Sequence, residues 1–548
     1  MSRSTCALLV FLFALPAAEA GLPLPPAYAH RLRGPDIRVR AIEGLDERVQ
    51  DGKLYLRLKD FLELVLKNDT EIQMMRLDVL PAADAVLAAK AVFDPSVTLG
   101  FNALRSASPS YTQIAGAETL SSLSHQAQIE ASQMLPSGQS LSIGFQGTRL
   151  SDNSQFSLFN PSISSGLTLG IVQPLLQNRG NIQYLAPLRI ARTQLRIATE
   201  RTEASIADAV ASAATRYWDA IQARDNIRVA QLSVDLAQKS YDHDKLALDL
   251  GALSKLDIFQ SESQVAERKV DVIRAQYAYR DALDGLRRLI GADLNPATRN
   301  IEIVLEDDPS SLPLGAVSTA EGAIQSALAH RPELSAIDRQ AGIEDLNARV
   351  ARDSMLPKLD LGVQFGGNGL GGNQVPASNA LGGPSSFVSG GLGDALSQMF
   401  RFSAPFYGFS LQMTIPVRSS RAQANLTDAL VGRARDRYQR RQTEQQIIQE
   451  VKAALNQLDM AHAQIDAAKT ARDLAHQNVD AQQQKYEIGG ITAFELLDAQ
   501  SRLAGIEGTL VASYANYQKA LVAYRRATWT LLDGFGIIVE TPRVPGEN

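Results

Sequence analysis

The sequence predicts a mainly α-helical protein with a transmembrane β-barrel part, built from internally duplicated long helical hairpins. Residues 236–288 and 474–526 carry the same pattern and align without a gap, which indicates the duplication. In each copy, apolar residues recur at helical spacing and glycine interrupts them once. Between the helical stretches of each half lie segments in which apolar and polar residues alternate, as they do in β-strands.

The first twenty residues predict a secretory signal peptide, residues 1–20, that is cleaved. Arg3 precedes an apolar run over residues 7–18, and Ala18-Glu19-Ala20 offers small residues for cleavage. The run is too short to span a membrane as a helix; an uncleaved anchor is the alternative. The single cysteine, Cys6, precedes this run, so we expect a mature chain without disulfides or thiolate chemistry.

The sequence pattern divides the rest of the chain into an N-terminal segment, two repeats and a C-terminal tail. An extended N-terminal segment covers residues 21–53, the first repeat 54–300, the second repeat 301–532 and the tail 533–548. The formal net charge of −5 gives no basis for expecting nucleic acid as a partner. No apolar run is long enough for a membrane-spanning helix.

Strand-like alternation occurs at matching places in the two repeats. In the first repeat it covers residues 96–104 and 165–173, after a helical region over residues 54–93. In the second it covers residues 358–366 and 407–415, again after a helix. An extra hairpin over residues 123–149 occurs in the first repeat alone, whereas the second has a glycine-rich stretch, residues 366–393, which we interpret as a long surface loop.

Each repeat ends in a long helical hairpin, over residues 182–290 and 419–530. Gly251 and Gly489 stand where a left-handed residue ends the first helix. A capping residue and an acidic residue three positions later then begin the returning helix: Ser254 and Asp257 in one copy, Thr492 and Glu495 in the other. Apolar residues along the first helix alternate at spacings of three and four, a coiled-coil seam rich in alanine. Because alanine buries little surface, lateral neighbours must cover this helix.

The strands are about as long as tilted strands that cross a bilayer. The same alternation would suit a soluble, half-buried sheet, but the helices leave no sequence for a second layer that could cover the apolar face. Four to six strands from one chain cannot close a membrane barrel, which needs about eight. We therefore expect a barrel shared between chains.

These features together resemble the TolC-type outer-membrane efflux protein family, also called the outer membrane factors, over roughly residues 54–532. The match is carried by the twin tips, by the strand-ending Gln173-Pro174 and Ile415-Pro416, and by the stretch from Ala327 to Leu334, which contains His-Arg-Pro-Glu-Leu. The resemblance implies a homotrimer in which strands of three chains form one barrel in the outer membrane of a Gram-negative-type cell. An α-helical barrel would continue it across the periplasm.

The resemblance further implies an exit duct of a tripartite efflux or type I secretion system, which passes small molecules or proteins outward. Its partners would be a periplasmic adaptor (membrane fusion) protein, an inner-membrane transporter of the RND or ABC type, and outer-membrane lipid. The extra hairpin departs from the family's four strands per chain, and the sequence leaves open whether it enlarges the barrel.

The resemblance also assigns roles to residues at the periplasmic end. Glu495 and Asp498 match the acidic pair of the entrance constriction, where threefold symmetry would gather six carboxylates. The simpler alternative is that these acids only stabilise the start of their helix, through its dipole and its cap. Tyr486 and Asp257 match a contact that holds the entrance shut, although Ile491 replaces the family's frequent arginine. The positions that would meet the adaptor are the hairpin tips, Gly251, Ala252, Gly489 and Gly490.

Two other functions compete with a channel. An enzyme is not expected, because no nucleophile motif, phosphate loop or metal-ligand spacing is present, and no cofactor is expected either. Asp242-His243-Asp244 comes nearest to a ligand cluster, and we interpret it as a solvated helix face. A non-conducting structural coiled-coil envelope protein is the second rival, but it would need neither paired strand sets nor converging acids at the tips.

Overall fold

The computed structural model describes residue 39 and residues 41–109, 117–154, 157–251, 254–296, 298–311, 319–374 and 390–536. Contacts divide the chain into Met1–Glu43 and Gly44–Asn548, and the account below concerns the second unit. The predicted signal peptide, most of the extended segment and residues 537–548 of the tail lie outside the described residues. No helix in the described ranges combines the length and apolar character needed to cross a membrane.

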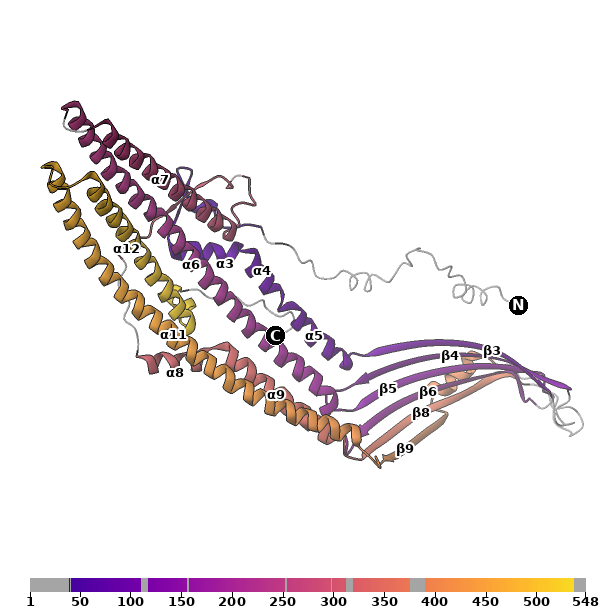
Figure 1. The fold of residues 1–548 in the computed structure, drawn as a ribbon. Helices are drawn as coiled ribbons and strands as arrows, with labels where there is room; N and C mark the ends of the chain where they lie inside the picture. Colours follow the sequence, from indigo (N-terminus) through magenta and orange to yellow (C-terminus); the bar gives the residue numbers. More distant parts are fainter. Residues whose placement is uncertain are drawn as a thin grey trace, which may run out of the picture. The chain divides into compact units, whose positions relative to one another are not determined.

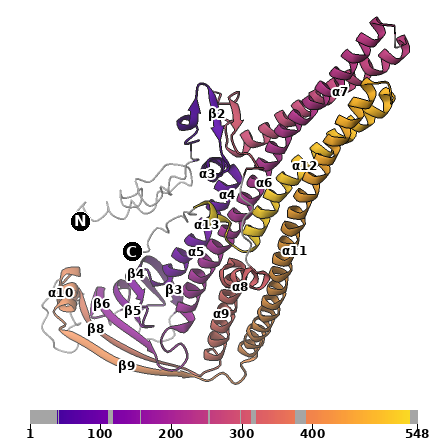
Figure 2. The same ribbon diagram turned by 90° about the vertical axis from the view of Figure 1, so that its left-hand side faces the viewer.

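Two helical hairpins of matching size dominate the unit and lie side by side (Figures 1 and 2). The first consists of α6 (Ile182–Asp249, 68 residues) and α7 (Lys255–Leu289, 35 residues). The second consists of α11 (Ser420–Glu487, 68 residues) and α12 (Ala493–Ala527, 35 residues). The equal lengths follow from the internal repeat, and the predicted seam of α6 is buried from Ile206 to Ala220.

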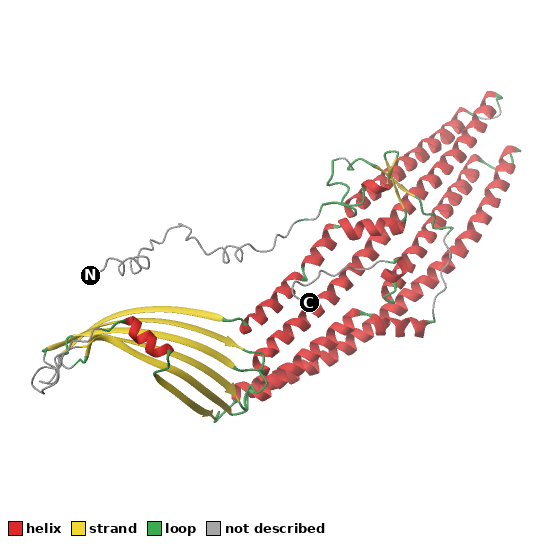
Figure 3. Ribbon diagram, turned by 180° about the vertical axis from the view of Figure 1, so that it is seen from behind, coloured by secondary structure: helices red, strands yellow, loops and turns green. Residues whose placement is uncertain are grey.

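A six-stranded sheet adjoins the hairpins (Figure 3). Its strands are β3 (Ser96–Pro109), β4 (Thr119–Met134), β5 (Ser140–Asp152), β6 (Phe159–Pro174), β8 (Lys358–Gln374) and β9 (Ala404–Thr414), in that spatial order. All neighbours are antiparallel. The extra hairpin is therefore β4–β5, and it lies within the sheet between β3 and β6.

The register gives the sheet one apolar and one polar face. Paired residues are both odd-numbered or both even-numbered across the sheet, as in the row formed by Leu99, Ile129, Phe145 and Leu167. The exception is the Phe159–Gln374 pair, which lies beyond a register shift at the start of β6 and the end of β8. Side chains that are paired across antiparallel strands point to the same face, so odd-numbered residues form an apolar face and even-numbered residues a polar one. Three basic residues lie on the apolar face toward its loop end: Arg105, His125 and Arg149.

The interpretation of residues 366–393 as a surface loop is wrong at both of its ends. Strand β8 continues to Gln374, and helix α10 (Leu392–Phe400) begins before residue 393; residues 375–389 lie outside the described residues. The glycines allow close packing instead. A Cβ atom on Gly369 would lie 1.8 Å from the Ala395 carbonyl oxygen, so α10 packs with its backbone directly on β8. Ser165 of β6 donates a hydrogen bond of 2.9 Å to the same oxygen.

A second, three-stranded sheet and several shorter helices lie beside the hairpins. Strands β1 (Val49–Gln50), β2 (Lys53–Leu56) and β7 (Glu302–Leu305) pair in the order β1-β2-β7. Two boundaries are therefore corrected: the segment predicted as extended contains the short 3-10 helix Asp46–Arg48, strand β1 and the first residue of β2, and the helical region begins only after β2. The helices of this part are α3 (Leu58–Asn68), α4 (Thr70–Leu77) and α5 (Leu80–Lys90), followed by the 3-10 helix Ala91–Phe93.

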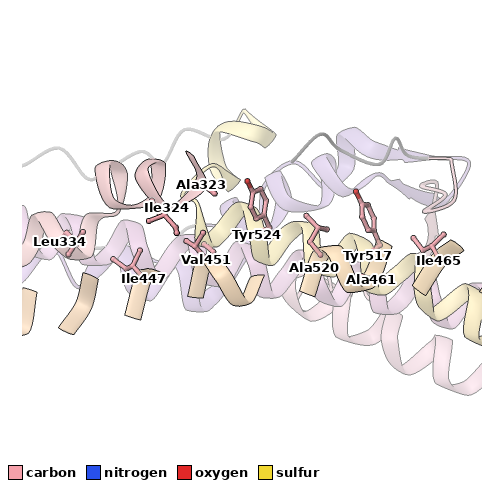
Figure 4. Close-up of a cluster of buried hydrophobic side chains, with 13 residues drawn as sticks. Ala323, Ile324, Leu334, Ile447, Val451, Ala461, Ile465, Tyr517, Ala520 and Tyr524 are labelled. Atoms are coloured by element: carbon pink, nitrogen blue, oxygen red, sulfur yellow. The ribbon is translucent and has the colours of Figure 1, made fainter. Parts of the chain in front are cut away.

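Helices of the second repeat pack into a buried apolar cluster (Figure 4). It joins α8 (Ala320–His330) and α9 (Pro332–Asp353) to α11 and α12 through residues such as Val451 and Tyr517. At its edge Arg331, which separates α8 from α9, is 6% exposed and donates from Nε to the Ala527 carbonyl at 3.0 Å. A guanidinium at the carbonyl end of α12 satisfies an acceptor that the helix leaves free. The short helix α13 (Leu531–Phe535) follows and extends into the predicted tail.

Candidate functional site: the hairpin tips and the contact between the hairpins

Both hairpins turn on a glycine with a left-handed backbone. Gly251 has φ +76° and Gly489 has φ +74°, a conformation that side chains with a Cβ rarely adopt. The Gly489 and Gly490 amides donate to the carbonyls of Tyr486 and Lys485 at 2.9 and 2.8 Å, which closes the end of α11. Ala252 lies outside the described residues.

The returning helix of the second hairpin begins at the predicted residue. The Thr492 hydroxyl accepts a hydrogen bond of 3.4 Å from the Glu495 amide, so Thr492 is the N-cap of α12. In the first hairpin Ser254 immediately precedes α7, the position predicted for its cap. Both tips therefore combine a left-handed glycine with a hydroxyl residue directly before the returning helix.

A buried carboxylate joins the two hairpins just behind the tips. Asp244 of α6 is 1% exposed and accepts a hydrogen bond from the hydroxyl of Tyr486 of α11. Its second oxygen accepts from the hydroxyl of Ser261 of α7. The His243 ring packs on the Tyr486 ring, with centroids 5.2 Å apart. We call Asp244, Tyr486 and Ser261 the inter-hairpin latch.

The latch concerns two predictions made from the sequence: the solvated face at residues 242–244 and the contact between Tyr486 and Asp257. Interpreting Asp242-His243-Asp244 as a solvated face is wrong for Asp244, which is buried, and holds for the exposed Asp242. The pairing of Tyr486 with Asp257 stays a prediction, because the Asp257 side chain lies outside the described residues. The sequence does contain a signal that Asp244 is buried. The apolar seam of α6 runs through Val234, Ala237 and Tyr241, and Asp244 is the next position on it, three residues later.

Further polar contacts and a small apolar cluster hold the hairpins together beside the latch. Gln500 of α12 donates to the hydroxyl of Ser240 of α6 at 3.0 Å, and both side chains are buried. Arg268 of α7 donates to the hydroxyl of Ser501 of α12. The apolar cluster consists of Val479, Ala499 and Leu503, with Leu236 and Ala475 packed against it. Buried polar groups require defined partners, so the Gln500–Ser240 contact stabilises the observed arrangement of the hairpins.

The two acids predicted for the constriction are exposed on one face of α12. Glu495 and Asp498 are three residues apart. Leu496, which follows Glu495, and Ala499, which follows Asp498, are buried. Asp498 pairs with Arg502 of the same helix, with Oδ2 2.6 Å from an Arg502 nitrogen. The sequence reasoning did not anticipate this pair. Because the arginine offsets one carboxylate, each chain presents about one net negative charge here, instead of two.

Exposed apolar side chains mark both tips. Leu250 is 76% exposed and Ile488, its equivalent in the repeat, is 82% exposed. Phe494 of α12 is also largely exposed. Within the described ranges, no group of three or more His, Cys, Asp or Glu side chains is placed to hold a metal ion.

Known proteins share this architecture. The structure of CusC aligns with a TM-score of 0.61 at 17% identity, covering 90% of this chain and 98% of that one. The Campylobacter jejuni outer membrane channel CmeC aligns with a TM-score of 0.59 at 14% identity, covering 86% of each chain. At these identities the likeness shows the fold, which is a helical barrel part joined to a β-barrel part.

Sequence comparison adds a relative and a family. The pyoverdine export outer membrane protein OpmQ of Pseudomonas putida is 26% identical over 155 residues, which make up 28% of this chain and 32% of OpmQ. The match thus spans about a third of that relative. The profile of the family described as outer membrane efflux protein matches residues 61–292 and 323–528, which include both helical hairpins. The chain therefore belongs to the outer membrane efflux protein family and is a protein of the outer membrane.

Proposed function

We propose that this chain forms the exit duct of a tripartite efflux or type I secretion system, which carries small molecules or proteins from the periplasm to the exterior. The observation that carries the proposal is the direct succession of sheet and hairpin in both repeats. Strand β6 leads into α6 and strand β9 into α11, through short connections. A barrel wall in the membrane thus continues as a helical wall on the periplasmic side.

The duct is a homotrimer in this proposal. Its long helices expose alanine-rich and polar surfaces that a single chain leaves uncovered, such as the exposed positions along α11. Lateral contact with two further copies would bury them, because helices of this length gain most of their stability from packing. Outer-membrane lipid would surround the barrel.

The tips are the proposed contact with a periplasmic adaptor protein, which links the duct to an inner-membrane transporter of the RND or ABC type. Leu250 and Ile488 support this, because exposed apolar side chains at the end of a hairpin are characteristic of a docking surface. Gly251, Ala252, Gly489 and Gly490 would let the tips fit closely against the partner.

Glu495 and Asp498 are the proposed constriction at the periplasmic entrance. Both point away from the buried side of α12, and in a trimer they would gather in one ring. The Asp498–Arg502 pair lowers the net charge of this ring, so we expect a moderate preference for cations. The latch, with the predicted Tyr486–Asp257 contact beside it, would hold the second hairpin in the closed position.

Planar-bilayer conductance of the purified trimer in a salt gradient tests the proposal. The wild type should conduct with a cation preference, and the double variant Glu495→Ala plus Asp498→Ala should show a weaker one. Asp459→Ala, which changes an exposed acid of α11 in the middle of that helix and far from the tip, is the control and should keep the preference. Unchanged selectivity in the double variant would remove these acids from the constriction.

A non-conducting structural envelope protein is the competing function. It would give no conductance from a folded trimer, whether or not the latch is weakened by Tyr486→Phe. Conductance from the wild type or from Tyr486→Phe would contradict this alternative.

A further inference from the structure

We propose that the extra hairpin β4–β5 widens the outer-membrane barrel: six strands from each of three copies form one barrel of eighteen strands. The contact that closes it joins strand β9 of one copy to strand β3 of the next. The inference rests on the proposed homotrimer and goes beyond it, because it gives the width of the pore and the size of its cargo.

The first observation is the pair of free strand edges. In the order β3-β4-β5-β6-β8-β9, one edge of β3 and one edge of β9 carry backbone N–H and C=O groups without a partner among the described strands. Hydrocarbon offers no hydrogen bonds, so an open edge does not persist inside a bilayer. Six strands are also too few to close on themselves, because the smallest membrane barrels have about eight. A second copy of this chain supplies the missing edge.

The two edges have the polarity that such a contact requires. Strand β3 runs away from the helices, and β9 runs back toward them into α11. Placed side by side, the two strands are antiparallel, like every neighbouring pair within the sheet. An even number of strands per chain keeps this alternation around the whole barrel, as in other outer-membrane barrels.

The faces of the two edges also match. Leu99 on β3 is 74% exposed, and Tyr407 and Phe409 on β9 are 85% and 82% exposed, all on the apolar face. Leu169, in the middle of the same face, is only 38% exposed. The added exposure at both edges shows where neighbouring strands are missing. Joining β9 to β3 continues the apolar band toward lipid and the polar band toward the lumen.

Helix α10 covers the one part of a strand edge that this contact would leave open. Strand β9 pairs with β8 only as far as Asn368, beyond which β8 continues. There Gln398 of α10 donates to the Leu370 carbonyl at 2.9 Å and accepts from the Leu370 amide at 3.2 Å. The β8 edge is therefore satisfied within the chain, which leaves β3 and β9 as the edges that need a partner.

Eighteen strands make a considerably wider pore than twelve. With strands about 4.8 Å apart and tilted by about 40°, a twelve-stranded barrel measures roughly 24 Å across its backbone and an eighteen-stranded one roughly 36 Å. A side-chain layer of about 5 Å on each side leaves a lumen of roughly 14 Å or roughly 26 Å. Barrels of 16 to 18 strands enclose an aqueous channel, so the hairpin adapts this duct to bulky cargo.

The lumen-facing residues suit unselective passage. Serine, threonine, glutamine and glycine predominate at the even-numbered positions of the strands. The described strands place four charged side chains on this face, namely Glu130, Asp152, Lys358 and Asp360, and the last two pair at 3.0 Å. Small, uncharged polar groups neither narrow the lumen nor bind ions strongly. Bulky polar solutes are the class of cargo that this lumen admits.

Disulfide cross-linking tests the seam on a Cys6→Ser background, which removes the only native cysteine. Leu99→Cys would be combined in turn with Tyr407→Cys, Phe409→Cys and Leu411→Cys, which are spaced two residues apart on the same face. One of these pairs should yield covalent dimers and trimers on non-reducing gels. Leu99→Cys with Ser410→Cys places the thiols on opposite faces and should yield none. Absence of cross-links from all three pairs would contradict the β9–β3 contact.

Two further measurements locate the hairpin. Leu99 and Ile129 are direct partners in β3 and β4, so Leu99→Cys with Ile129→Cys should close a disulfide within one chain of the trimer. A cryo-electron microscopy map of the wild-type trimer in lipid nanodiscs should show eighteen strands and a barrel roughly 36 Å across. Twelve strands in a conducting trimer would overturn the wide barrel and leave the proposed duct intact. Eighteen strands without conductance from either the wild type or Tyr486→Phe would support the barrel and contradict the duct.

Discussion

Removing the Tyr486 hydroxyl should favour the open entrance. Tyr486→Phe keeps the ring that packs against His243 and deletes the hydrogen bond to Asp244. Hydrogen bonds to charged groups contribute about 1.5–3 kcal/mol, and the buried position of Asp244 excludes water as a ready substitute. Since about 1.4 kcal/mol changes an equilibrium tenfold, the closed state should lose roughly ten- to hundredfold in population per chain, relative to the open state.

Single-channel recording of the purified trimer measures this effect as open probability. The matched control is Tyr438→Phe, which removes a hydroxyl from an exposed tyrosine of the same helix α11. Ser261→Ala removes the other donor to Asp244 and should raise the open probability in the same direction. An open probability for Tyr486→Phe equal to that of Tyr438→Phe would refute the latch as a closing element.

Three other changes test further parts of the structure. Gly369→Ala should lower the melting temperature of the trimer, because its Cβ would collide with α10 and overpacking costs about 1–3 kcal/mol; Gly144→Ala has open space and should not. Tyr217→Phe should cost about 1 kcal/mol, because it removes a buried hydroxyl that lies 2.8 Å from Asp307 Oδ2 and 3.0 Å from the Leu56 carbonyl; an unchanged melting temperature would contradict this. Burial and the Asp307 carboxylate raise the pKa of Tyr217 above its ordinary 10.0. The folded state therefore holds this proton longer than the unfolded state, so stability should fall as the pH rises above 10, and less steeply in Tyr217→Phe. Ile488→Asp should weaken adaptor binding in a pull-down by at least tenfold without changing the conductance of the trimer, and equal binding would exclude this tip.

Local rules were enough to predict the helical hairpins and most strands. Gly251 and Gly489 end their helices because few other residues adopt a left-handed backbone, and Thr492 caps the next helix through its own hydroxyl. Alternation located β3 and β9 because one side of each strand is apolar along its length. These signals involve residues close in sequence, so they can be read from the chain alone.

Local rules failed where a residue's environment comes from another part of the chain. The glycines of β8 have the composition of a loop, and only the position of α10 shows that they make room for a helix backbone. Asp244 looks solvated beside Asp242, yet Tyr486 and Ser261 from two other helices bury it. Arg331 likewise finds its acceptor at Ala527, far along the chain.

The sequence by itself determined the duplication, the helical tips, the alternating strands and the family. Each follows from spacing or backbone preference within a short window of residues. Tertiary structure alone decided that β4–β5 lies inside the sheet, that α10 covers β8, and that Asp244 joins the hairpins. These depend on which distant segments pair, because strand order and burial are set by the packing of the whole chain rather than by any local pattern.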